Sequence, residues 1–231
     1  MMNVLNVKGA KAIASALTVA AVMSTNLMAQ EIDVKITNNT NGIYFTPLLV
    51  SAHPMSTALF MGGEAASANL QAMAEGGDIS GLVDDLALVN ADSVANPASG
   101  LLAPGSTTMT TLTTASDNTN LSVVAMMLPT NDGFVALNNW KIPTEAGTYI
   151  INVNAYDAGT EANTELVADI PADPGAKIGT GATGMTTTVE GYVHVHRGTV
   201  GDSDANAGKS DLDVSAHRWL NPVATIRVTV K

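Results

Sequence analysis

Two short stretches in the middle of the chain concentrate the side chains that could bind a metal ion. Residues 128–140 and residues 151–165 each run from an apolar segment into a loop. Their oxygen-bearing side chains are Asp132, Asn138, Asn139, Asn154, Asp157, Thr160, Glu161 and Glu165. Calcium takes six to eight oxygen ligands, mostly from flexible loops. Two such loops at one end of a β-structure predict a calcium site, although Asn, Asp and Gly are also ordinary turn residues.

A second group with metal-binding chemistry is the pair His194 and His196. Residues two apart on a strand face the same side, and such a pair can begin a zinc site, which needs three or four ligands. The pattern assigns Val193 and Val195 to the core and leaves both histidines facing solvent. No third ligand is specified nearby, since His217 comes much later in the chain. The sequence therefore disfavours zinc.

Residues 202–213, with the sequence DSDANAGKSDLD, imitate a calcium loop of the EF-hand type. Oxygen-bearing residues occupy positions 1, 3, 5, 9 and 12 of this segment, as such a loop requires. The glycine needed at position 6 is replaced by Ala207, with Gly208 one place late, and the flanks are extended rather than helical. We expect a solvated acidic hairpin loop here.

Enzymatic motifs are lacking in the sequence. There is no GxSxG element, and the adjacent acids Asp84 and Asp85 fall on an expected helix, where neighbouring side chains diverge. We expect no enzyme. The alternative is a secreted hydrolase that uses a metal site at His194 and His196, or an acidic cleft.

Residues 1–29 have the features of a secretory signal peptide. Lys8 and Lys11 precede an apolar core over residues 12–23, and a small residue, Ala29, stands before Gln30. That core is shorter than the roughly 20 residues that span a bilayer. We therefore expect export to the periplasm, the cell surface or the extracellular space, with residues 30–231 forming one domain.

The composition of residues 30–231 excludes several classes of function. These residues hold eight of the ten basic side chains and all 21 acidic ones, a net charge of −13. Such acidity argues against nucleic acid, which binds clustered Lys and Arg, and against anionic lipid unless cations bridge the two surfaces. The absence of cysteine excludes disulfides and thiolate chemistry, so core burial must supply stability.

Hydrophobic periodicity predicts an all-β protein. Strands with alternating or fully apolar patterns are expected at residues 31–37, 107–114, 122–128, 148–156 and 224–231. Two short helices are expected in the N-terminal half, one over residues 64–75 that stops at Gly76 and Gly77, and one capped by Ser80. Residues 171–188, rich in Gly, Pro, Ala and Thr, predict a long surface loop. The expected fold is an antiparallel β-sandwich with one or two inserted helices.

Two motifs in these stretches resemble those of the spondin N-terminal domain family. PTNDGFVA, residues 129–136, corresponds to the family's Pro-Ser-Pro-Asp-Trp-Phe-Val-Gly, and YDAGTE, residues 156–161, to its Trp-Asp-Ala-Gly-Thr-Asp. Upstream, YFTPLLVSAHP at residues 44–54 and the segment 59–78 are similar to bacterial members. The resemblance spans roughly residues 32–230.

The resemblance implies a C2-like β-sandwich that binds calcium at its loops and acts in matrix or membrane attachment. Carried over by position, Asp132 and Asp157 are the first ligand candidates, followed by Asn138 and Glu161. Asn138 stands where the family has an acid, which implies weaker calcium binding than in animal relatives. The expected function is an exported, non-enzymatic adhesion module whose partner is an extracellular protein, a glycan or a membrane surface.

Overall fold

The computed structural model describes residues 29–171, 186–204 and 208–231. The expected signal peptide, apart from its last residue, and most of the expected loop over residues 171–188 lie outside these ranges. No helix in the described ranges is long and apolar enough to cross a membrane.

The described elements are mostly antiparallel strands, as the sequence predicts. The strands are β1 (Glu31–Asn38), β2 (Tyr44–Phe45), β3 (Leu49–His53), β4 (Asp92–Ala95), β5 (Thr107–Thr113), β6 (Asn120–Leu128), β7 (Gly133–Lys141), β8 (Gly147–Asp157), β9 (His194–Val195) and β10 (Ala224–Val230). The helices are α1 (Ala68–Gly76), α2 (Ser80–Leu88), the 3-10 turn η1 (Val167–Asp169) and α3 (Val214–His217).

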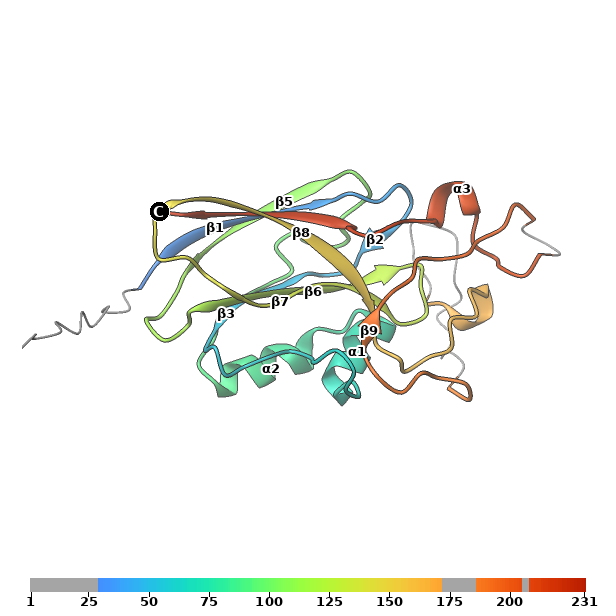
Figure 1. Cartoon of the computed structure of the whole chain (residues 1–231), viewed down its shortest axis with the longest axis horizontal. Coiled ribbons are helices and arrows are strands. Elements are labelled where there is room, and N and C mark those ends of the chain that lie inside the picture. Colours follow the sequence, from blue (N-terminus) through green and yellow to red (C-terminus); the bar gives the residue numbers. More distant parts are fainter. Residues whose placement is uncertain (1–28, 172–185, 205–207) are drawn as a thin grey trace, which may run out of the picture.

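The strands form a nearly closed antiparallel sheet that folds into two layers, which confirms the predicted β-sandwich (Figure 1). The hydrogen-bonded order is β4-β3-β6-β7-β8-β10-β1-β5. Strand β8 links the layers, because residues 147–153 pair with β10 while residues 154–157 pair with β7. Strand β8 thus connects the two layers, and its last residues, 154–157, lie beside the start of β7.

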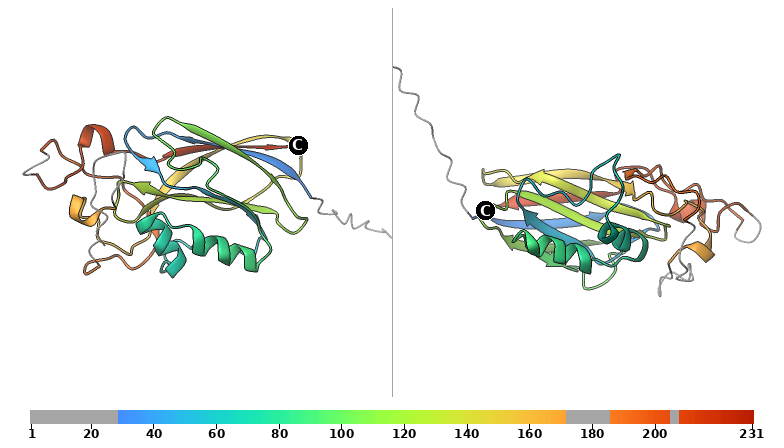
Figure 2. Two further views of the ribbon diagram at one scale, coloured as in Figure 1. Left: turned by 180° about the vertical axis from the view of Figure 1, so that it is seen from behind. Right: turned by 90° about the horizontal axis from the view of Figure 1, so that it is seen from below.

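Two hydrophobic cores explain the burial pattern of the strands. In β1, Ile32, Val34 and Ile36 alternate with more exposed residues and pack in the core between the layers. Strand β6 is buried along its whole length, because its other face is covered by α1 and α2 (Figure 2). Leu70 and Met73 of α1 belong to this second core. Each fully buried side chain of this kind contributes about 1.5–3 kcal/mol, and the chain has no disulfides to assist.

The two helices begin at different residues from those predicted. Helix α1 starts at Ala68 rather than residue 64, because the Ser67 hydroxyl accepts a hydrogen bond from the Leu70 amide and caps the helix there. It ends at Gly76, and the next residue, Gly77, caps it with a φ of 71°, the left-handed conformation that glycine adopts readily. Ser80 is the first residue of α2 and not its cap, while its amide donates to the Asp78 carboxylate.

One end of the sandwich gathers the long loops, and we call it the loop end. Strand β7 begins and β8 finishes there, next to β9 and α3 (Figure 1). The C-terminus and the start of β1 lie together at the opposite end, where Ile32 pairs with Val230. The two predicted acidic loops therefore meet at the loop end.

Candidate functional site

Asp132 and Asp157 lie side by side at the loop end, because Gly133 and Asp157 are partners across the β7–β8 pair. Both carboxylates are buried, with 0% and 1% of the side chain exposed. Oδ2 of Asp132 accepts hydrogen bonds from the amides of Thr160, at 2.7 Å, and Glu161, at 3.1 Å. The structure thus places Asp132, Asp157 and the backbone of Glu161 at one end of the sheet, although among the described residues the ligand atoms of these three side chains do not all lie within 4.8 Å of one another.

The Asp132 carboxylate is under electrostatic strain. Its Oδ1 atom is buried and has no hydrogen-bond partner among the described residues. The pKa of Asp132 is raised to about 6, chiefly by burial and also by the nearby Asp157 charge, while hydrogen bonds from the Glu161 and Thr160 amides act in the opposite direction. In the described part of the chain no Lys or Arg forms an ion pair with either acid. A divalent cation would relieve both burial and repulsion, so the arrangement fits one.

Asn138, the fourth predicted ligand, is elsewhere. It lies five residues along β7 from Gly133, about 16 Å away at the usual rise of a strand. Its Oδ1 accepts from the Leu59 amide at 3.1 Å and its Nδ2 donates to the Phe60 carbonyl at 2.7 Å. Asn138 therefore ties the segment before α1 to the sheet, and its amide group is already satisfied there.

Asp157 also lies close to one residue of its own motif, Gly159, and to several residues outside the motif. Its Oδ1 accepts from the Gly159 amide at 2.8 Å and its Oδ2 from the Asn163 side chain at 2.7 Å. Nε2 of His194 lies 3.6 Å from Oδ1, and Nε2 of His196 lies 3.9 Å from Oδ2. Both distances are longer than a hydrogen bond.

The prediction that both histidines face solvent opposite a core of two valines is wrong. Val193 is buried, but Val195 is 51% exposed, and His196 is only 6% exposed. Strand β9 has only two residues, and beyond it the His196 amide donates to the Ala155 carbonyl. Trp219 covers the His196 ring with the centroids 5.0 Å apart. Burial lowers the pKa of His196, and the Asp157 charge acts in the opposite direction.

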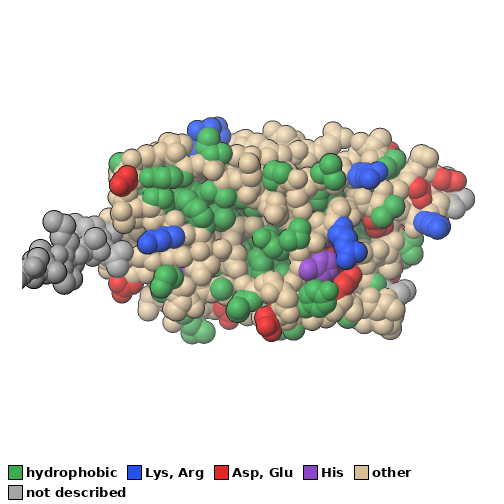
Figure 3. Space-filling view, viewed as in Figure 1, with side chains coloured by type: hydrophobic (Ala, Val, Ile, Leu, Met, Phe, Trp, Pro, Cys, Tyr) green, Lys and Arg blue, Asp and Glu red, His purple; other side chains and the backbone are tan. Residues whose placement is uncertain are grey.

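Asp157, His194 and His196 line a pocket of about 250 Å³ at the loop end. Its lining residues are Asp157, Asn163, Glu165, Glu190, His194, His196, Arg197, Gly198 and Val200. The face drawn in Figure 3 shows a histidine flanked by a basic and an acidic side chain. Sequence reasoning missed Asn163 and Glu190. Asn163 stands inside the second acidic stretch and could have been included, whereas no local pattern marks Glu190.

Glu165 lines the pocket and also holds its outer loop in place. One carboxylate oxygen accepts from the Val200 amide at 2.6 Å. The other accepts from the Gly201 amide at 2.9 Å and from the Ser210 hydroxyl at 2.6 Å. Because both oxygens are used, Glu165 is an anchor for the loop rather than a candidate ligand.

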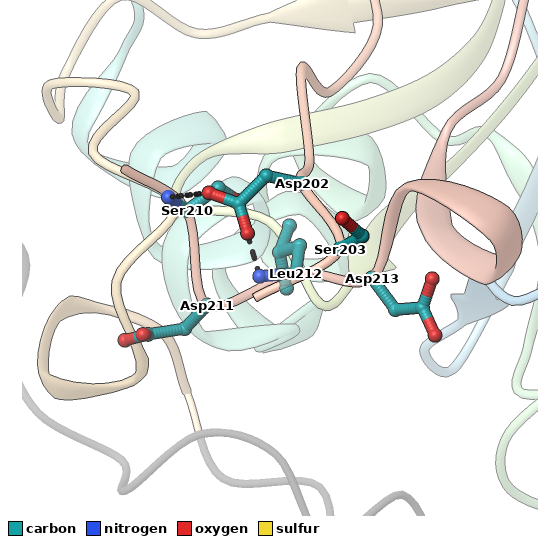
Figure 4. A pocket seen from close by; sticks show the side chains of 6 residues that line it. All are labelled: Asp202, Ser203, Ser210, Asp211, Leu212 and Asp213. Carbon is teal, nitrogen blue, oxygen red and sulfur yellow. Dashed lines mark hydrogen bonds between the residues drawn. The ribbon is translucent and has the colours of Figure 1, made fainter. Parts of the chain in front are cut away.

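The described residues of the segment that imitates an EF-hand, 202–204 and 208–213, are not arranged as a calcium loop. The Asp202 carboxylate accepts from the amides of Asp204, Lys209 and Ser210. Figure 4 shows the carboxylates of Asp211 and Asp213 directed away from it. The segment is also not a hairpin, since its ends are joined by a parallel bridge from Asp202 to Asp213. Its acids serve as acceptors for the segment's own backbone and its neighbours.

His217, the third histidine considered for a zinc site, does not line the pocket. It ends α3, where its Nδ1 accepts a hydrogen bond from the Asp213 amide at 3.0 Å. A three-histidine site does not form.

The fold and the buried acids define a β-sandwich module with a carboxylate-rich loop end. The Spondin_N family model matches residues 34–189, which is 156 of the 231 residues. The chain belongs to the spondin N-terminal domain family, and this confirms the resemblance seen in the two motifs. Membership fits an extracellular binding module. No curated protein gives a significant match to the chain.

Proposed function

We propose that this protein is an exported, non-enzymatic binding module in which a calcium ion at the loop end organises the surface that holds an extracellular partner. The observation that carries the proposal is the buried Oδ1 of Asp132, which lacks a hydrogen-bond partner among the described residues and belongs to a carboxylate close to a second buried acid, Asp157. Burying two adjacent carboxylates is costly unless a cation compensates them.

The residues that would hold the ion are Asp132, Asp157 and Glu161. Asp132 immediately precedes β7, Asp157 is the last residue of β8, and Glu161 lies in the loop after β8. They come from both motifs, so the ion would clamp the loop over residues 158–165 to the sheet. Backbone carbonyls and water would complete a calcium shell of six to eight oxygens. The bound ion would supply positive charge at the loop end, and these side chains would hold it in place.

The acidity of the molecule explains why a cation would matter for attachment. With a net charge of −13 over residues 30–231, the protein repels anionic glycans and anionic lipid headgroups. A calcium ion at the loop end lowers the local negative charge and can bridge to an acidic partner. The partner class is therefore an extracellular protein, a glycan or a membrane surface met in the presence of calcium. No observation on the described residues favours the alternative of a hydrolase.

Calcium should raise the melting temperature of the purified protein, and Asp132→Asn or Asp157→Asn should abolish most of that rise. A ligand that binds only the folded state adds about 2.7 kcal/mol at a hundredfold excess over its dissociation constant. Asp84→Asn is the matched control, because Asp84 is exposed on α2 and its change lowers the net charge by the same amount.

Thermal melts with calcium and with magnesium measure this effect. If wild type responds equally weakly to both ions, or if all three variants respond alike, the calcium site is wrong. Binding to immobilised anionic glycan or to phosphatidylserine vesicles, with calcium and with chelator, then tests the attachment role separately.

A further inference from the structure

A second group of metal-binding atoms lies on the other side of Asp157. One carboxylate oxygen of Asp157, one of Glu190 and one ring nitrogen of His194 all lie within 4.8 Å of one another. Asp157 ends β8, His194 begins β9, and Glu190 lies on the segment between, which the Gly191 amide ties to the Gly159 carbonyl. Two stretches of backbone, the end of β8 and the segment that leads into β9, therefore bring these three donor atoms together.

The hydrogen bond that His194 makes fixes the tautomer of its neutral ring. Nδ1 lies 3.1 Å from the Val195 carbonyl, and because a carbonyl only accepts, Nδ1 carries the proton. Nε2 of the neutral ring is then an acceptor. It is buried, has no hydrogen-bond partner among the described residues, and faces the Asp157 Oδ1 at 3.6 Å. Two acceptors placed this way repel each other unless a cation or a proton lies between them.

His196 gives a second, independent indication. The Gly198 amide donates to Nδ1 of His196 at 3.0 Å, so its proton lies on Nε2. Nε2 lies 3.9 Å from Oδ2 of Asp157, too far for a hydrogen bond, and belongs to a side chain that is 94% buried. A small shift of Asp157 toward the pocket would complete that bond. His196 is therefore placed to orient Asp157, as partners of metal-bound carboxylates do.

We propose that His194 Nε2, Asp157 and Glu190 form a site for a zinc-class divalent metal, with His196 as the residue that positions Asp157. Imidazole nitrogen favours borderline first-row metals such as zinc, whereas calcium takes oxygen ligands only. Three protein ligands leave a fourth position, which opens to the pocket of about 250 Å³ and can take water or a donor atom of a partner.

This site is distinct from the proposed calcium site. The two share Asp157, but Asp132 and Glu161 belong only to the calcium site, and His194 and Glu190 only to the zinc site. Each can therefore be removed without touching the ligands of the other, and failure of one proposal leaves the other standing.

The test is zinc titration by calorimetry of full-length, untagged protein after chelation, repeated with cobalt to read the ligand field by visible absorption. Wild type should bind one zinc ion per chain, and millimolar calcium should not displace it. His194→Gln and Glu190→Gln should each weaken zinc binding at least tenfold. Glu190 is exposed, so its variant should fold as wild type does. Asp132→Asn should lose the calcium response and keep zinc.

His217→Gln and Glu145→Gln are the matched controls, because His217 lies in α3 outside the pocket and Glu145 lies between β7 and β8 at the opposite end of the sandwich. Both should bind zinc as wild type does. His196→Gln should retain more zinc affinity than His196→Leu. The reason is that glutamine keeps an N–H donor that can position Asp157, whereas leucine has none. Wild type that binds no zinc at micromolar concentration overturns the proposal, as does unchanged affinity in both His194→Gln and Glu190→Gln.

Discussion

The Asp132 carboxyl group combines burial with a neighbouring acid, and this gives it an unusual titration. Its pKa is raised from 3.8 to about 6, so the folded protein holds a proton there over a range of pH in which the unfolded chain does not. Stability from this group is fully present below pH 3.8 and is lost as the pH rises through about 6. The size of the loss is about 3 kcal/mol for a shift of this order.

We expect Asp132→Asn to remove this part of the pH dependence in metal-free protein. Urea denaturation of wild type and variant in chelator, from pH 4 to pH 7, should show the wild type losing stability relative to the variant as the pH rises. Calcium should reverse the trend for wild type above pH 6, because the ion binds the deprotonated carboxylate. Parallel pH profiles in the two proteins would contradict the buried placement of Asp132.

The burial of His196 gives a second prediction at a single residue. His196→Ala should lower the free energy of unfolding by roughly 2 kcal/mol, because it removes a ring packed against Trp219 and leaves a cavity. Val195→Ala is the matched control and should change it by less than about 0.5 kcal/mol, since Val195 is half exposed. Chemical denaturation measures both. The alternation pattern alone predicts the reverse order, so the pair of variants decides which face is buried.

At the scale of elements, the loop end depends on a few side chains that bond to backbone far away in the sequence. The described residues of the loop over 198–213, namely 198–204 and 208–213, have little regular structure, and Glu165 accepts three hydrogen bonds from them. Glu165 itself has a φ of 56°, a left-handed conformation that is uncommon outside glycine. A loop held this way is stiff only while its anchor is intact.

Glu165→Ala should therefore loosen this loop and destabilise the protein by a few kcal/mol, because three donors, two of them in buried hydrogen bonds, lose their acceptor. Limited trypsin digestion should cut the variant faster than wild type at Lys209, which lies within the loop. Glu145→Ala, at the far end of the sandwich, should leave the cleavage rate unchanged. Equal cleavage of Glu165→Ala and wild type would show that the loop has other anchors.

At the scale of the whole molecule, the sheet begins where the expected leader ends. Strand β1 starts at Glu31 and pairs with both β5 and β10, and the Gln30 amide donates to the Thr114 hydroxyl. Removal of residues 1–29 would leave every strand of the sandwich intact. The loop end, at the opposite end of the sandwich, would stay free to meet a partner.

Protein recovered from its native host should begin at Gln30. Intact-mass spectrometry checks this directly. Recovery of the protein with Met1 still attached would contradict export, and with it the extracellular setting in which calcium is abundant.

The β-sandwich and the acidic residues of the proposed calcium site could be predicted from local sequence patterns. Strict alternation in β1 and β10, and the continuous apolar run of β6, follow from burial on one face or on both, so the pattern predicts them. Asp132, Asp157 and Glu161 were predictable because two short motifs fix their places at the ends of neighbouring strands. The start of α1 was harder, because Ser67 and Glu64 offer competing signals and only one forms a cap.

The further side chains that lie near Asp157 could not be predicted, because their positions depend on long-range strand pairing. Asn138 is close to Asp132 in sequence, but an extended strand carries it away and the loop before α1 uses its amide group. His194 and Glu190 reach Asp157 because β9 pairs with the end of β8, a contact between residues 37 positions apart that no local pattern encodes. Local periodicity reports which face of a strand is buried, whereas the assembly of a site depends on which distant strands pair and on their register.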